Sequence, residues 1–69
     1  MKHTNVNSTN IASVGYDPEK KLMQIKFKTG TTYEYSDVPE ETHKSFMGAE
    51  SVGKHFFQHI KGKYSHRKV

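Results

Sequence analysis

The segment from Ser51 to Lys54, S-V-G-K, contains the residue types that bind a phosphate group. Ser51 can cap a helix, Gly53 allows a ligand to approach the backbone, and Lys54 places a positive charge near the unpaired amides of the first turn. The segment is not a Walker A loop, because the preceding glycine and its spacing are missing. We therefore expect phosphate contact without nucleotide hydrolysis. The alternative is that Ser51 is only a cap, Gly53 only a packing residue and Lys54 only a solvated side chain.

His55 and His59 are one helical turn apart, a spacing that suits two imidazole ligands of zinc. His66 and Glu50 lie outside the predicted helix, so no third ligand is evident, and the sequence predicts no metal and no other cofactor. A nucleophilic arrangement of Ser51 with His55 has only Glu50 as its acid, and Glu50 would have to orient the imidazole from a loop. We therefore predict no catalytic residue and no enzymatic activity.

The positive charge is concentrated at the C-terminus. The formal net charge is +4, yet residues 1–50 carry a small excess of acidic residues. From residue 51 onward there is no acid and there are five cations, Lys54, Lys61, Lys63, Arg67 and Lys68. Such a segment attracts polyanions, and the alternative is a solvated surface that keeps the protein soluble.

Length and composition restrict the class of protein. A chain of 69 residues with no cysteine forms one small domain without disulfides or a thiolate metal site. The N-terminus is polar, and no apolar run is long enough to span a bilayer. We therefore predict a cytoplasmic protein with no membrane partner.

Three strand-like segments follow a polar start. Residues 11–17, 21–27 and 32–36 alternate apolar and polar side chains, and Pro18 and Gly30 lie at the two expected reversals. Tyr33 and Tyr35 share one face of the third segment, where we expect them to be core residues. The alternative is that these two tyrosines are exposed and stack on nucleic-acid bases.

Two helices are predicted after the strands. Pro39 suits the first turn of one helix, whose narrow apolar stripe consists of Val38, Thr42, Phe46 and Ala49. The second helix begins after Ser51, and its apolar arc consists of Gly53, Phe56, Phe57, Ile60 and Tyr64. The predicted fold is therefore α+β, with a three-stranded antiparallel meander followed by two helices packed on one face. Residues 1–9 are expected to be a flexible lead-in, residues 10–65 the domain and residues 66–69 a basic tail.

Several short motifs together resemble those of the KTSC domain, which is named for the C-terminus of some lysyl-tRNA synthetases and also occurs as a stand-alone protein. These motifs are S-V-G-Y-D, F-K-T-G-T-T-Y-E-Y, V-P, A-E-S-V-G-K and F-F-Q-H-I-K-G-K-Y, which occur in that order between residues 8 and 64. The family's serine-x-glycine falls on Ser51 and Gly53, and its isoleucine-basic pair falls on Ile60 and Lys61. The resemblance implies RNA binding and no catalytic residue.

Two functions are consistent with the sequence. The first is a non-enzymatic module that binds RNA, including tRNA, or another polyanion through phosphate contacts. The residues predicted for it are Ser51, Gly53, Lys54, Lys61, Lys63, Arg67 and Lys68. The alternative is a protein-interaction module of phage or mobile-element origin that docks through a strand edge or the first helix.

Overall fold

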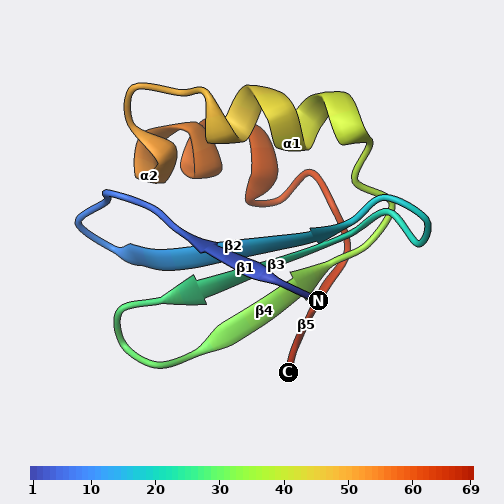
Figure 1. Ribbon diagram of the computed structural model, residues 1–69, viewed down its shortest axis with the longest axis horizontal. Coiled ribbons are helices and arrows are strands. Elements are labelled where there is room, and N and C mark those ends of the chain that lie inside the picture. Colours follow the sequence, from blue (N-terminus) through green and yellow to red (C-terminus); the bar gives the residue numbers. More distant parts are fainter.

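The structure confirms the α+β class and contains a larger sheet than the sequence predicts. The computed structural model describes residues 1–69 as a five-stranded antiparallel sheet with helices over one face (Figure 1). The strands follow each other in the sheet as in the chain: β1 (His3–Asn5), β2 (Ile11–Asp17), β3 (Leu22–Phe27), β4 (Thr32–Tyr35) and β5 (His66–Lys68). Between β4 and β5 the chain forms α1 (Glu40–Met47), α2 (Val52–His55) and the π-helical turn η1 (Phe56–Ile60). None of these helices is long and apolar enough to cross a membrane.

The prediction of a three-stranded sheet is wrong because it omits the two edge strands. β1 pairs with β2, with Thr4 opposite Val14, and β5 pairs with β4, with Arg67 opposite Glu34. Each edge strand has three residues, and all of these side chains are at least partly exposed. A strand that joins the sheet mainly through its backbone shows no hydrophobic alternation, so its sequence resembles a polar tail.

The two central hairpins form as predicted. In the turn between β2 and β3, the Asp17 carboxylate accepts hydrogen bonds from the backbone N–H groups of Glu19 at 3.0 Å and Lys20 at 3.3 Å. The turn between β3 and β4 contains Gly30 at φ +100°, a backbone conformation that residues with a side chain rarely adopt. These turns fix the register in which Ile25 lies opposite both Val14 and Tyr33.

The core lies between the sheet and the helices. Ten apolar side chains form it: Ile11, Val14, Met23, Ile25, Tyr35, Val38, Phe46, Val52, Phe56 and Ile60. The last helical segment contributes Val52, Phe56 and Ile60 at intervals of four residues. Phe57, which was predicted to belong to this face, is instead 55% exposed. Val52 occupies the core in its place, because so short a helix buries only a narrow stripe.

Candidate nucleic-acid interface

Ser51 and Gly53 have structural contacts at the start of α2. The Ser51 hydroxyl caps the helix by accepting a hydrogen bond from the Lys54 backbone N–H at 3.3 Å. Gly53 packs on the loop between β1 and β2, where a Cβ atom would lie 3.2 Å from the Ser8 hydroxyl oxygen. These contacts favour the cap and packing interpretation of both residues. The exposed Lys54 ammonium is the group of this turn that remains available to a ligand.

Lys61 and Lys63 follow η1 and are exposed. The Lys61 backbone N–H donates to the Phe56 carbonyl oxygen at 2.8 Å, which closes the wide π-helical turn. Its ammonium nitrogen lies 5.0 Å from the centre of the Phe57 ring, within the range of a cation–π contact. The turn therefore holds a cation and an exposed aromatic ring side by side.

Arg67 and Lys68 belong to opposite sides of β5. Arg67 faces Glu34, and its guanidinium forms an ion pair with that carboxylate at 3.0 Å. Lys68 lies opposite Tyr33, so it is directed to the face of the sheet that carries the tyrosines. The structure thus separates Arg67 from the other four predicted cations, none of which forms an ion pair within the protein.

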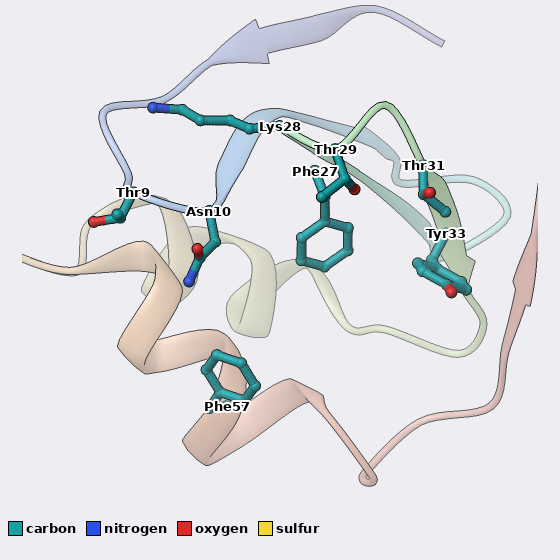
Figure 2. A pocket seen from close by; sticks show the side chains of 8 residues that line it. All are labelled: Thr9, Asn10, Phe27, Lys28, Thr29, Thr31, Tyr33 and Phe57. Atoms are coloured by element: carbon teal, nitrogen blue, oxygen red, sulfur yellow. The ribbon is translucent and has the colours of Figure 1, made fainter.

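An aromatic hollow that includes the exposed Phe57 ring was not predicted as a site. It has a volume of about 630 Å³ and lies between the end of the sheet and η1 (Figure 2). Phe27 and Tyr33 border it from the strands, and Phe57 borders it from the helix. The remaining lining residues are Thr9, Asn10, Lys28, Thr29 and Thr31.

A smaller hollow of about 270 Å³ continues from the first. It shares Phe27, Tyr33 and Phe57 with the first hollow. Its other lining residues are Tyr35, Phe56, Lys61, Gly62 and His66. We call the two hollows together the aromatic groove. No carboxylate lines either part, whereas Lys28 lines the first and Lys61 the second, so the groove is apolar with a positive border.

Edge-to-face contacts fix the floor of the aromatic groove. The buried Phe56 ring lies 5.4 Å from Phe27, 5.7 Å from Tyr35 and 5.5 Å from Phe57, measured between ring centres. Burial raises the pKa of Tyr35 to about 12, so its hydroxyl is neutral at physiological pH. Tyr35 is therefore a core residue as predicted, whereas Tyr33 is partly buried and borders the groove.

The groove could have been suspected from two features of the sequence. Phe57 and Lys61 are four residues apart, as neighbouring side chains of a helix are. Phe27 and Tyr33 flank the turn at Gly30, as residues of a hairpin end do. Neither feature shows that only one of the two adjacent phenylalanines fits in the core.

His55 and His59 lie together on another side of the helix. Their ring centres are 4.4 Å apart, and both line a hollow with Glu41, Thr42, Ser45 and Tyr64. Burial lowers the pKa of His55, and the nearby His59 lowers it further. The protein contains no group of three or more His, Cys, Asp or Glu side chains arranged to hold a metal ion.

Known proteins with similar sequences or structures align with most of this chain. An uncharacterized protein of Stutzerimonas stutzeri is 38% identical over 61 residues, which cover 88% of this chain and 86% of the relative. A lysine--tRNA ligase of Nostoc punctiforme is 35% identical over 54 residues, which cover 78% of this chain but 10% of the ligase. The crystal structure of a KTSC domain protein from Yersinia pestis has 43% sequence identity and a TM-score of 0.94, and the match covers 99% of this chain and 96% of that one.

The family model of the KTSC domain matches residues 7–64, which include β2 to β4 and the whole helical layer. The matched region also contains every residue that lines the aromatic groove except His66, and it contains three of the five C-terminal cations. The resemblance seen in the sequence is therefore confirmed, and this chain belongs to the KTSC domain family.

Proposed function

We propose that this KTSC domain binds RNA by contacting phosphates with the exposed cations of its C-terminal segment. The observation that carries the proposal is that Lys54, Lys61, Lys63 and Lys68 form no ion pair with a carboxylate of the protein. Ammonium groups that are exposed and unpaired keep their full attraction for phosphate, and RNA binding releases the counterions that the RNA had condensed. Arg67 can join these contacts through the part of its guanidinium that faces solvent, because its side chain is 74% exposed.

The names of two relatives favour RNA as the polyanion. Two Nostoc proteins with a matching region are lysine--tRNA ligases, and in each of them this region is about 10% of the chain. A module joined to an enzyme of that name is well placed to increase contact with tRNA. We therefore expect this chain to bind RNA in preference to other polyanions, and we expect the phosphate contacts to be weakly selective for sequence.

The protein-interaction alternative has less support from the fold. Both edge strands have three residues, which offers a partner strand little backbone to pair with. The exposed side of α1 carries Glu40, Glu41, Lys44 and Ser45 rather than an apolar stripe. A pull-down after nuclease treatment separates the two functions, since a protein-docking module keeps its partners and an RNA-binding module loses those that RNA had bridged.

Fluorescence titration with labelled single-stranded RNA tests the proposal. In the double variant Lys61→Gln and Lys63→Gln, we expect weaker binding at ~50 mM salt. If both lysines contact phosphates, the slope of log affinity against log salt should fall by about 1.4. The matched control is the double variant Lys20→Gln and Lys21→Gln, which removes the same charge from the exposed turn between β2 and β3.

Two results would contradict the proposal. One is undetectable binding of the unmodified protein to any RNA at ~50 mM salt. The other is an equal loss of affinity in both double variants, because that would mean that net charge alone, and not the C-terminal segment, is responsible.

A further inference from the structure

We infer that the aromatic groove binds an unpaired RNA base, which stacks on the ring of Phe57. This inference rests on the proposed RNA-binding function and adds a preference for single strands to it. Phosphate contacts attract any nucleic acid, whereas a site for one base requires a strand whose bases are free to leave their stacks.

The exposure of Phe57 is the first observation. Phe57 is 55% exposed, and Phe56 beside it is 4% exposed. It borders both hollows of the groove, but Lys61 lines only the smaller one. The side of the ring that faces the larger hollow is therefore free of the ammonium, and it gives a base a flat apolar surface on which to stack.

The size and lining of the larger hollow are the second observation. Its volume of about 630 Å³ falls within the range of roughly 300–1,000 Å³ that is usual for sites of small organic groups. Phe27 and Asn10 project from the strand side toward Phe57 (Figure 2). A planar base between them would have an aromatic ring on either side and a carboxamide at its edge.

Polar side chains at the rim are the third observation. The carboxamide of Asn10 and the hydroxyls of Thr9, Thr29 and Thr31 form no hydrogen bond within the protein. A carboxamide both donates and accepts, as the edge of a base does. These groups can therefore pair with a base that has left its own helix, which distinguishes the site from a purely apolar surface.

The charge of the border is the fourth observation. Lys28 lines the larger hollow and Lys61 the smaller one, and neither has an ion-pair partner. Lys68 is directed to the same face of the sheet, opposite Tyr33. A strand with one base in the groove can therefore place phosphates near cations at both ends, which is the usual arrangement for single-stranded nucleic acid.

Affinity measurements with the full chain test the inference. The ligands are a ten-nucleotide oligouridylate, an abasic ribose-phosphate strand of the same length and an RNA duplex, each labelled with fluorescein. We expect the uridylate to bind roughly 5- to 150-fold more tightly than the abasic strand, which corresponds to the stacking of one base on an aromatic side chain. The substitution Phe57→Ala should remove this difference, and Phe57→Tyr should keep it. Circular dichroism checks that both variants fold.

A spectroscopic reporter locates the base. The chain contains no tryptophan, so Phe57→Trp places a single tryptophan in the groove, and it can be excited selectively at wavelengths that the tyrosines hardly absorb. We expect saturating uridylate to quench its emission and the abasic strand to leave it unchanged.

The outcomes distinguish the inference from the proposed function. If uridylate and the abasic strand bind equally well, or if Phe57→Ala leaves the affinity for uridylate unchanged, the base site is absent although phosphate binding stands. If no strand binds at ~50 mM salt, the proposed function fails and the base site fails with it.

Discussion

The two faces of the sheet are stabilised by different interactions. The face under the helices is apolar, with Val14, Met23 and Ile25 buried almost completely beneath Phe46 and the last helical segment. The opposite face has no covering layer of helices (Figure 1). A chain of hydrogen-bonded side chains crosses its strands, and it includes one residue from each, namely His3, Ser13, Gln24, Glu34 and Arg67.

The hydrogen-bonded chain has a defined direction. The Gln24 amide nitrogen donates to the Glu34 carboxylate at 2.9 Å, so the amide oxygen is left to accept from the His3 ring nitrogen Nε2 at 2.9 Å. The other ring nitrogen, Nδ1, then accepts from the Ser13 hydroxyl at 2.9 Å when the ring is neutral. At the far end, the Arg67 guanidinium donates to the second oxygen of Glu34 at 3.2 Å.

The two faces contribute to stability in different ways. The covered face contributes the burial of apolar surface, the main source of stability in a domain without disulfides. The open face joins the short edge strands to the sheet and satisfies two buried polar residues, Ser13 and Glu34. We therefore expect substitutions on the covered face to unfold the domain, and substitutions on the open face to release its edges.

The largest effect is expected from Phe56→Ala. Removing a buried phenylalanine costs about 3–5 kcal/mol, and a domain of this length has about 3–10 kcal/mol in total. Urea denaturation followed by circular dichroism should therefore show a variant that is partly or largely unfolded in buffer. Phe57→Ala is the matched control, since its ring is 55% exposed and its removal should cost less than about 1 kcal/mol. Equal losses in the two variants would contradict the assignment of Phe56 alone to the core.

The same pair of residues shows how far the sequence predicts the fold. Alternation in the central strands and the positions of Pro18 and Gly30 were sufficient to predict both hairpins. Pro39, Ser51 and the helical spacing of apolar residues were sufficient to predict the helices that follow. The spacing within the last helix could not separate Phe56 from Phe57, because both fall on an arc drawn at 3.6 residues per turn. The π-helical turn and the burial of Val52 decide between them, and both depend on contacts with the sheet and not on local sequence.

The edge strands could not be predicted, and the sequence gives only partial signals of the groove, for related reasons. β1 and β5 join the sheet through their backbones and through pairs such as Arg67 with Glu34, which are far apart in the sequence. The groove likewise combines Asn10, Phe27 and Phe57, which belong to three separate segments. The lysines of the C-terminal segment could be named from charge alone, whereas the aromatic surface beside them required the tertiary structure.

An intermediate effect is expected from Glu34→Gln on the open face. The variant loses the ion pair with Arg67 and places an amide where two hydrogen-bond donors converge. We expect a cost of about 1.5–3 kcal/mol, which is typical for a hydrogen bond to a charged group. Arg67 can return to solvent, so the full penalty of a stranded buried charge does not apply.

Hydrogen exchange measured by NMR shows where the loss occurs. In Glu34→Gln the amides of β5 should exchange faster while those of β3 keep most of their protection. Glu41→Gln on the exposed side of α1 is the control and should change neither. Uniform acceleration across the sheet would mean that the open face supports the whole fold and not its edge alone.

The smallest effect on stability is expected from a change of pH. The histidines of the helical layer and Glu34 on the open face should lose their contributions in different pH ranges. Burial lowers the pKa values of His43 and His55 in the helical layer, so the unfolded chain binds protons more readily than the folded one. The resulting stability is complete above the unfolded value of 6.5 and decreases as the pH falls below it. The pKa of Glu34 is also lowered, mainly by the Gln24 hydrogen bond, but its unfolded value is 4.5, so its contribution is lost only in more acidic solution. Thermal unfolding between pH 7.5 and 5.5 should therefore show a decrease that the double variant His43→Gln and His55→Gln reduces and that Glu34→Gln leaves in place. If the double variant kept the slope of the unmodified protein, the proton uptake would have to come from groups other than these two histidines.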